Sequence, residues 1–330
     1  MSFPRKWESS GGGGGVILNE VKDPIPRSMD SSDSLHSPQN DNMKIDLHIH
    51  TSTGSDGAFT QAQVFDEAAR RGIGFLSITD HDNIDSQAEA VALAGEMGIG
   101  YVTGVELNVI FPYAGKSVSL DFLGYGYDLR DRALQEKLQL AREHRVVRAR
   151  QIMDNLNAEF RQEGRPVFTD EDLEAMQAGV DGILSRPHIA DYLIKKGIVA
   201  GRQEAFDRYL VKCDVPKYPL SLEEASRLVR EAGGRLVLAH PNDPHGTSLL
   251  SLTTDLVEQA RVIEREMLDL IDGIECWHSR ADAATTTHYI DFCRRHRLLM
   301  TGGSDCHQQP VIMGTIGVPE YVSEILNSKL

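Results

Sequence analysis

Short apolar runs alternate with amphipathic stretches along much of the chain, and this pattern predicts an α/β fold. The predicted strands are 44–49, 74–79, 100–105, 235–239, 273–277 and 298–301. The predicted helices between them are 61–71, 84–97, 222–231, 249–269 and 281–296. A repeated strand–helix–strand order indicates parallel βαβ units. In a barrel-like arrangement of such units, the carboxyl ends of the strands meet at one face, where active sites lie.

The alternation stops near Asp128 and resumes after residue 212. Residues 130–164 read as one long charged helix, and 170–176, 186–196 and 201–210 read as shorter helices without a good strand among them. We therefore expect a helical insertion at 130–212 that divides the α/β domain into 44–129 and 213–330. Residues 1–43 contain a five-glycine run and a Ser, Asp, Asn and Pro-rich stretch. Such a composition buries little apolar surface, so this segment is expected to be a disordered tail, with Met43 as a plausible alternative start.

The bulk composition is that of a globular enzyme. Of the 330 residues, 41% are hydrophobic and 25% are charged, and no apolar stretch is long enough to span a membrane. Cys213, Cys276, Cys293 and Cys306 lack zinc-finger or disulfide-framework spacing, and no signal-peptide core is present, so we expect a reducing cytoplasm. The formal charge of -15 disfavours broad binding to nucleic acid, but bound cations would still permit a small anionic substrate.

Histidines and acids follow several of the predicted strands. They occur in Asp-Leu-His-Ile-His at 46–50, Thr-Asp-His-Asp at 79–82, Ala-His-Pro at 239–241 and Gly-Ser-Asp-Cys-His at 303–307. Each motif alone has an ordinary explanation as a polar strand end or turn. The candidate ligands are His48, His50, Asp56, His81, Glu106, His188, His240, Asp305 and His307. Glu106 is expected to end the third strand. Because one ion needs four to six ligands, this set predicts a multinuclear centre of Zn²⁺, Mn²⁺ or Fe²⁺.

Taken together, these motifs resemble the PHP (polymerase and histidinol phosphatase) family over about 44–124 and 180–310. The resemblance also covers Arg-Pro-His at 186–188 and Gly-Ile-Glu at 273–275. It implies a distorted (β/α)7 barrel with an α-helical insertion and three divalent ions (Mn, Fe or Zn). It implies a first ion held by His48, His50, Glu106 and Asp305. It implies a second held by Glu106, His188 and His240, and a third held by Asp56, His81 and His307.

Some PHP proteins have histidine where Asp56 stands. The aspartate and the insertion resemble the stand-alone branch, which removes the 3′-phosphate of 3′,5′-bisphosphonucleosides or trims nucleotides from RNA 5′ ends. We therefore expect a small phosphorylated nucleotide as substrate, with AMP as a possible product and short RNA as a possible partner. Neither a membrane nor an obligate protein partner is indicated.

The expected reaction is the hydrolysis of a phosphomonoester by a hydroxide that bridges two ions. Arg186 is the strongest candidate for binding the phosphate, and the other candidates are Arg145, Arg148, Lys217 and His278. Asp80 or a metal-bound water is the candidate proton donor. Three alternatives stay open: a 5′-3′ exoribonuclease or oligonucleotidase, a histidinol-phosphate phosphatase, and a non-catalytic metal-binding regulatory module.

Overall fold

The computed structural model describes residues 43–180, 184–244 and 247–329, so the predicted tail, apart from Met43, lies outside the described residues. The strands are β1 Lys44–Ile49, β2 Ile73–Ile78, β3 Gly100–Tyr101, β4 Gly104–Tyr113, β5 Lys116–Tyr125, β6 Arg235–Leu238, β7 Gly273–His278 and β8 Leu299–Gly303. The helices are α1 Gln61–Arg71, α2 Gln87–Met97, α3 Arg132–Gln162, α4 Asp170–Gln177, α5 Arg186–Lys195, α6 Arg202–Ala205, α7 Leu222–Glu231, α8 Leu256–Glu266, α9 Ala283–His296 and α10 Tyr321–Lys329. A π-helical turn, Phe206–Leu210, follows α6, and a 3-10 turn, Leu249–Ser251, precedes α8.

The strands form two sheets. One has the order β1-β2-β3 and is parallel, and the other has the order β4-β5-β6-β7-β8. In the second sheet β5 runs antiparallel to both neighbours, whereas β6, β7 and β8 are parallel. Isolated parallel bridges, Ile49 to Cys306 and His81 to Glu106, link the two sheets. The expected mixed α/β fold with parallel strands is confirmed. The expected (β/α)7 barrel is not, because the described residues form no closed sheet.

The third predicted strand differs from the observed structure. Here β3 has two residues, and Glu106 is the third residue of the ten-residue strand β4, so the prediction that Glu106 ends a strand was wrong. β5, which sequence reasoning did not predict, pairs with β4 along its whole length and places Asn108 opposite Asp121. The acidic Glu106 and the polar Asn108 make β4 hard to recognise from the sequence, because a polar residue inside a buried strand looks like the end of that strand.

Local signals explain where the helices begin and end. Thr60 and Gln63 form a capping box at the start of α1, and Gly72 ends that helix in the left-handed conformation at φ 71°. The Asp131 side chain accepts a hydrogen bond from the Leu134 backbone N–H and begins α3. No helix among the described residues is sufficiently long and apolar to cross a membrane.

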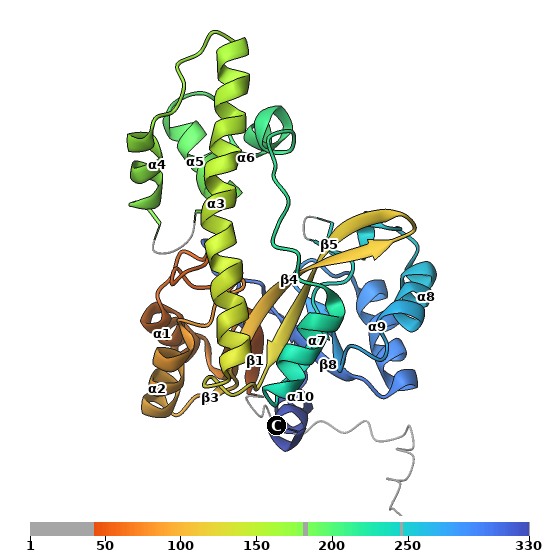
Figure 1. Ribbon diagram of the computed structural model, residues 1–330. Coiled ribbons are helices and arrows are strands. Elements are labelled where there is room, and N and C mark those ends of the chain that lie inside the picture. The colour runs from red at the N-terminus through yellow and green to blue at the C-terminus, as the bar shows by residue number, and fades with distance from the viewer. Residues whose placement is uncertain (1–42, 181–183, 245–246, 330) are drawn as a thin grey trace, which may run out of the picture. The chain divides into compact units, whose positions relative to one another are not determined.

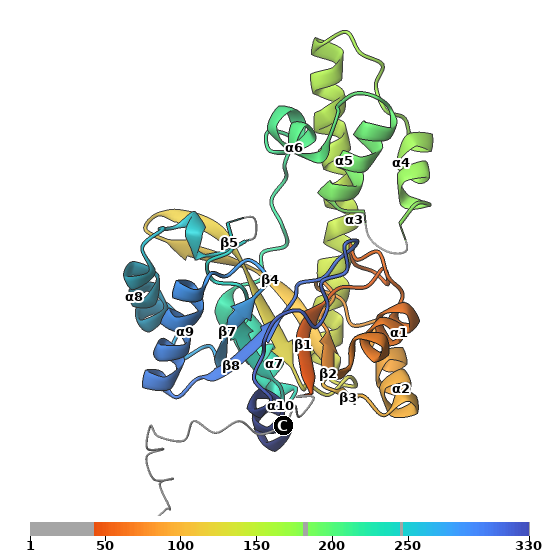
Figure 2. The same ribbon diagram turned by 180° about the vertical axis from the view of Figure 1, so that it is seen from behind.

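The insertion has a core of its own. Residues between Ala149 and Cys213 form a separate apolar cluster that includes Leu156, Phe160 and Tyr209. The amino-terminal half of α3 packs instead in the main core, through Leu134 and Leu138. Figures 1 and 2 show the helices α4, α5 and α6 gathered around the carboxyl-terminal half of α3. The long helix therefore belongs to both cores and connects them.

Close contact between β1 and β8 brings two of the sequence motifs together. A Cβ atom at Gly303 would lie 2.4 Å from the backbone nitrogen of His48, so only glycine fits at the end of β8. The Asp305 backbone N–H then donates to the His48 carbonyl at 2.8 Å, and the His50 N–H donates to the Cys306 carbonyl at 3.0 Å. The motifs at 46–50 and 303–307 thus become neighbours although they are far apart in sequence.

Candidate metal centre

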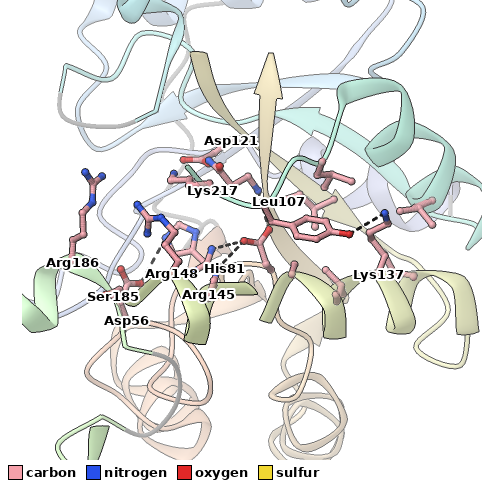
Figure 3. A pocket seen from close by; sticks show the side chains of 18 of the residues that line it. Asp56, His81, Leu107, Asp121, Lys137, Arg145, Arg148, Ser185, Arg186 and Lys217 are labelled. Carbon is pink, nitrogen blue, oxygen red and sulfur yellow. Dashed lines mark hydrogen bonds and ion pairs between the residues drawn. The ribbon is translucent and has the colours of Figure 1, made fainter. Parts of the chain in front are cut away.

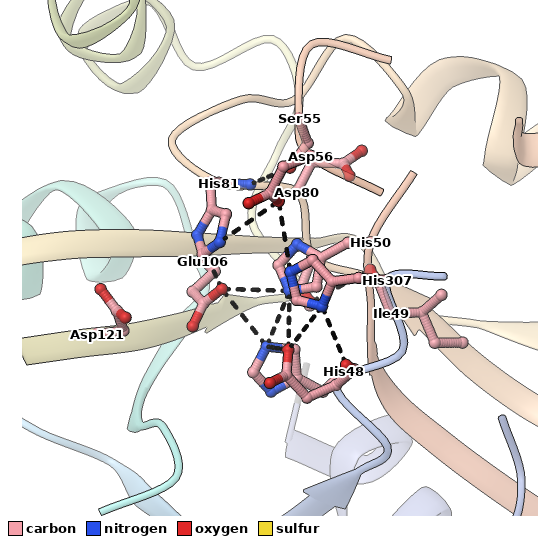
Figure 4. Close-up of polar contacts among 12 residues, drawn as sticks. His48, Ile49, His50, Ser55, Asp56, Asp80, His81, Glu106, Asp121 and His307 are labelled. Atoms are coloured by element: carbon pink, nitrogen blue, oxygen red, sulfur yellow. Dashed lines mark hydrogen bonds and ion pairs between the residues drawn. The ribbon is translucent and has the colours of Figure 1, made fainter. Parts of the chain in front are cut away.

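Most of the candidate ligands converge beside the ends of β1, β2, β6 and β8. Figure 4 shows His48, His50, His81, Glu106 and His307 pointing toward one another. The described residues contain four overlapping groups whose ligand atoms lie within 4.8 Å of one another. These groups are His50, Asp56, His81 and His307; His48, His278 and Asp305; His48, His50 and Glu106; and Glu106, Asp121 and His240.

His48, in β1, and His50, directly after it, point to the same side, as their spacing predicts. Their Nε2 atoms lie 3.1 Å apart. The Glu106 Oε2 atom lies 3.5 Å from the Nε2 of His48 and 3.2 Å from that of His50. The Asp305 Oδ1 atom lies 3.5 Å and 3.3 Å from the same two nitrogens. The structure therefore brings together all four residues that the resemblance implies for the first ion.

Glu106 also connects to two further groups. Its Oε1 lies 3.0 Å from the His240 Nε2, and its Oε2 lies 2.9 Å from the His81 Nδ1. Asp121, from β5, completes a group with Glu106 and His240. His188 lies outside all four groups, and its Nδ1 accepts a hydrogen bond from the Ser185 backbone N–H at 3.1 Å, at the start of α5. The structure thus places Asp121, and not His188, beside Glu106 and His240.

The residues implied for the third ion also lie together. The Asp56 Oδ1 atom is 3.3 Å from the His307 Nε2 and 3.7 Å from the His81 Nε2. The His50 ring lies 4.0 Å from the His307 ring and joins the same group. The loop after β1 therefore supplies the Asp56 carboxylate. The His50 imidazole belongs both to this group and to the group of His48 and Glu106.

Mutual attraction between imidazoles and carboxylates dominates the electrostatics. Burial alone would lower the pKa of His48, but the carboxylates of Glu275, Glu106 and Asp305 outweigh it and raise this pKa well above its usual value. In the same way Glu106 and Asp56 raise the pKa of His81 to about 9 against the effect of burial. The pKa of Glu106 is held well below its usual range, because His81 and His48 outweigh the effect of its own burial.

Unpartnered buried atoms show that these residues fit metal ions. The buried atoms without a hydrogen-bond partner include His50 Nδ1, Asp56 Oδ1, Glu106 Oε2, His240 Nδ1 and His278 Nε2. Buried polar atoms usually have a partner, so such a concentration requires an explanation. Imidazole nitrogens and carboxylate oxygens are the donors that Zn²⁺, Mn²⁺ and Fe²⁺ accept. Divalent ions held between these groups would give the unpartnered nitrogen and oxygen atoms a ligand bond and would offset the clustered carboxylate charge.

Glu275 orients two of the candidate ligands. It is buried, and its Oε1 accepts a hydrogen bond from the His48 Nδ1 at 3.0 Å. Its Oε2 accepts from the His240 backbone N–H at 2.8 Å. A carboxylate acceptor keeps the proton on Nδ1, so the Nε2 of His48 is free to bind a metal. The sequence comparison included Glu275 in a motif but assigned no role to it.

Asp80 supports the loop after β1. Its Oδ1 accepts from the Thr51 backbone N–H at 2.7 Å, and its Oδ2 accepts from the Thr51 hydroxyl at 2.7 Å. The side chain is fully buried, and burial raises its pKa. Both oxygens of Asp80 are thus engaged by Thr51, which holds the loop in place, and the role of Asp80 as proton donor stays a prediction.

A cavity of about 170 Å³ opens beside the metal-ligand groups. Figure 3 shows that His81, Asp121, Arg148, Arg186 and Lys217 surround it. Four of the five predicted phosphate-binding residues line this cavity, namely Arg145, Arg148, Arg186 and Lys217. The fifth, His278, lies elsewhere and forms a group with His48 and Asp305. The structure therefore associates His278 with the candidate ligands.

The cations of the cavity differ in how they are paired. Arg145 binds Asp82, with its Nε 3.0 Å from the Asp82 Oδ2. Arg148 and Arg186 share one acid, Asp214, and the Nη1 of Arg186 lies 2.6 Å from it.

Lys217 forms no hydrogen bond or ion pair with any residue that the structure describes. Burial lowers its pKa, although Asp121 acts in the opposite direction. Arg148 and Arg186 share a single carboxylate, so this part of the cavity has more cationic than anionic groups and suits an anion.

Sequence reasoning missed Asp121 as a candidate ligand. An available signal was its position in Ser-Leu-Asp-Phe-Leu-Gly at 119–124, where one acid interrupts an apolar run. A buried carboxylate is costly unless it is paired or binds a metal. That signal could be used only once the stretch was recognised as a strand.

Curated relatives and a solved structure match between 60% and 87% of the chain. The chain is 34% identical over 287 residues to a 3′,5′-nucleoside bisphosphate phosphatase of Chromobacterium violaceum, covering 80% of this chain and 87% of the relative. It is 32% identical over 205 residues to a 5′-3′ exoribonuclease of Haemophilus influenzae, covering 60% of this chain and 69% of the relative.

A solved structure from Bifidobacterium adolescentis, described as a candidate metal-dependent phosphoesterase, superimposes with a TM-score of 0.72. It is 27% identical and covers 87% of this chain and 96% of that chain. The model of the PHP domain matches residues 46–210, which include six of the nine candidate ligands and the long helix. With this match and the 34% identity over most of its length, the chain belongs to the PHP domain family of metal-dependent phosphoesterases.

Proposed function

We propose that this enzyme hydrolyses the 3′-phosphate of 3′,5′-bisphosphonucleosides and releases a nucleoside 5′-phosphate and inorganic phosphate. The observation that carries the proposal is the position of the cavity. The candidate ligands Asp56, His81 and Asp121 form one part of its wall, and Arg148 and Arg186 form another. A substrate with two phosphates can place one beside the metal-ligand groups and the other beside the arginines. The similarity to a relative named for this activity supports the same choice.

The residues would act in the following way. The groups around Glu106 would hold two or three divalent ions, which supply an activated water and neutralise the charge of the phosphoryl group. Water adds to phosphorus, the bond to the ribose 3′ oxygen breaks, and that oxygen takes up a proton. Arg186 and Arg148 bind the second phosphate through charged hydrogen bonds and orient the ester. Lys217 places its amino group in the same cavity, without a hydrogen-bond or ion-pair partner among the described residues.

Trimming of RNA from its 5′ end is the second candidate, because one relative is named a 5′-3′ exoribonuclease. A polynucleotide needs an extended basic groove. The compact cavity of about 170 Å³ is not such a groove. Arg142, on the same helix, is engaged with Asp85 at 2.6 Å. The geometry therefore favours the mononucleotide substrate.

Substrate competition tests the proposal. Protein stripped with a chelator and reloaded with Mn²⁺ is given adenosine 3′,5′-bisphosphate, a short 5′-phosphorylated RNA or histidinol phosphate. We expect AMP and phosphate from the first substrate at the highest kcat/KM. Arg186→Met should raise KM for the bisphosphate by about tenfold or more, since a charged hydrogen bond is lost. Arg202→Met is the matched control, because Arg202 pairs with Asp191 outside the cavity.

Two outcomes would contradict the proposal. A higher kcat/KM for RNA or for histidinol phosphate would assign the site to another ester. An equal effect of Arg186→Met and Arg202→Met would remove Arg186 from the phosphate site.

A further inference from the structure

Two arginines reach the cavity from different helices but share one acid that lies outside it. Arg148 belongs to α3, and Arg186 is the first residue of α5. Figure 3 shows both side chains beside the cavity, which they line. Asp214, which binds both arginines, does not line the cavity. An anion in the cavity can therefore contact the arginines, whereas Asp214 contacts them from outside.

The Asp214 carboxylate uses a different oxygen for each arginine. Its Oδ1 accepts from the Nη2 of Arg148, and its Oδ2 accepts from the Nη1 of Arg186 at 2.6 Å. The Oδ1 atom also accepts from the Val215 backbone N–H at 2.8 Å, which fixes the carboxylate itself. Because the two oxygens of a carboxylate have a fixed geometry, this one side chain determines how the two guanidinium groups lie relative to each other.

Each arginine has a second contact that restricts it further. The Nε of Arg148 donates to the Val215 carbonyl at 2.6 Å, and the Arg186 guanidinium lies 5.5 Å from the centre of the Phe206 ring. The two side chains are 12% and 26% exposed. A guanidinium group has more N–H groups than these contacts use, so each arginine keeps donors for an anion.

Repulsion between the arginines gives the shared acid a role. Burial lowers the pKa of the Arg148 guanidinium, and Arg186 and Arg145 act in the same direction, whereas Asp214 opposes them. Arg145 is itself paired with Asp82. Like charges at close range repel each other, so Arg148 and Arg186 would tend to separate without a carboxylate between them. Asp214 therefore keeps the two groups together before an anion binds.

We propose that Asp214 is a positioning residue for phosphate binding, which holds Arg148 and Arg186 as a pair whose remaining N–H groups bind one phosphate of the substrate. This inference rests on the proposed function, because it assumes a substrate phosphate at these arginines. Asp214 acts through the arginines and takes no space in the cavity. A carboxylate that merely competed with phosphate would have the opposite effect on affinity, so the direction of the change in a variant decides between the two roles.

Asp214→Asn removes the charge and replaces one acceptor oxygen with a donor, so one arginine loses its partner. The Mn²⁺-loaded enzyme is assayed on adenosine 3′,5′-bisphosphate. We expect KM to rise about tenfold with little change in kcat, because the phosphate is bound less well while the metal-ligand groups are unchanged. Asp214→Glu keeps both oxygens and should restore part of the affinity. Asp191→Asn is the matched control, because Asp191 binds Arg202 through two hydrogen bonds outside the cavity.

A double-mutant cycle separates positioning from a general structural role. In the Arg148→Met/Arg186→Met background, Asp214→Asn should cause no further rise in KM, because the residues through which it acts are absent. A rise by the same factor in both backgrounds would overturn the inference, since Asp214 would then act independently of the arginines.

A second measurement does not depend on hydrolysis. Calorimetry follows the binding of AMP to the Mn²⁺-loaded protein, and Asp214→Asn should weaken it by about tenfold whereas Asp191→Asn should not. An unchanged or lower KM in Asp214→Asn, with the bisphosphate still hydrolysed, would overturn the positioning role and leave the proposed phosphatase intact. Weaker binding of AMP by Asp214→Asn, in a protein whose natural form does not hydrolyse the bisphosphate, would support the positioning role and refute the proposed reaction.

Discussion

Among single side chains, Glu275 contacts two candidate ligands although it is not itself expected to bind an ion. It accepts from the His48 ring and from the His240 backbone. Burial opposes ionisation of Glu275, but His48 outweighs this effect and lowers its pKa. A charged acceptor makes the imidazole a stronger metal ligand and determines which nitrogen carries the proton.

Glu275→Gln should weaken metal binding by about ten- to a hundredfold, because outer-shell partners of ligating histidines typically contribute that much. Titration of the stripped protein with Mn²⁺ measures the effect. Glu264→Gln is the matched control, because Glu264 also pairs with a histidine, His296, at 3.0 Å but lies on the surface. Equal metal affinities in the two variants would show that Glu275 only fills space.

Asp121 and His188 are alternative candidates for the metal ligand beside Glu106 and His240. The structure places Asp121 there, and burial together with the nearby Glu106 raises its pKa. Asp121→Asn keeps the shape but removes the charge, so it should lose an ion that His188→Ala retains. Metal content per chain, measured by elemental analysis after gel filtration, distinguishes the two. Loss of an ion in His188→Ala alone would favour the ligand set that the family resemblance implied.

At the level of elements, α3 braces the loop that carries His81. Arg142 binds Asp85 through two hydrogen bonds, at 2.6 Å and 3.0 Å, and Arg145 binds Asp82. Asp82 has a left-handed backbone, at φ 47°, and its N–H donates to the Glu106 carbonyl at 2.7 Å. The loop is therefore held between the long helix and β4, and its strained backbone is maintained from both sides.

Arg145→Met should loosen this loop and weaken the ion expected at Asp56, His81 and His307. The Asp82 carboxylate, 9% exposed, would lose its charged partner and keep the hydrogen bond from the Asn108 N–H, which is unfavourable for a buried charge. We expect a roughly tenfold loss of affinity for the most weakly bound ion, with added Mn²⁺ restoring kcat. Arg150→Met is the control on the same helix, because Asp170, in an exposed ion pair, is the one partner of Arg150 among the described residues. If excess Mn²⁺ leaves kcat low and KM high, Arg145 contacts the substrate itself.

For the whole molecule, the clustered imidazoles predict how stability depends on pH. The metal-free pKa is about 9 for His81 and His240 and about 10 for His307, against about 6.5 in an unfolded chain. The folded-state pKa values are raised, so the stabilisation by these charges is complete below about pH 6.5 and is lost as pH rises through 9 to 10.

The metal-free protein should therefore lose thermal stability between pH 7 and 10, and the Mn²⁺-loaded protein should lose less, because ligating imidazoles carry no proton there. Melting temperatures across this range, with and without a chelator, check the prediction. His307→Gln should flatten the slope of the metal-free protein. A metal-free melting temperature that is constant or rises from pH 7 to 10 would contradict it.

Much of the fold could be read from local patterns. The helices α1 and α7 and the strand β1 have the predicted bounds, because caps, glycine stops and apolar periodicity are local properties. The hairpin of β4 and β5 was missed, because a strand that is buried on both faces lacks the alternation that marks a half-buried one. The two sheets are linked by isolated bridges instead of closing into a barrel. Such bridges join segments that are far apart in the sequence, so no local pattern predicts them.

The sequence by itself determined which chemistry is present and where along the chain it lies. Histidines and acids that follow apolar strands predicted a multinuclear centre, since parallel strands bring their carboxyl ends together. Only the tertiary structure decided which side chains share a group. It placed Asp121 beside Glu106, engaged Asp80 with Thr51 and paired Arg145 with Asp82. The physical reason is that strand register and helix packing determine where a side chain points, and both follow from burial across the whole molecule.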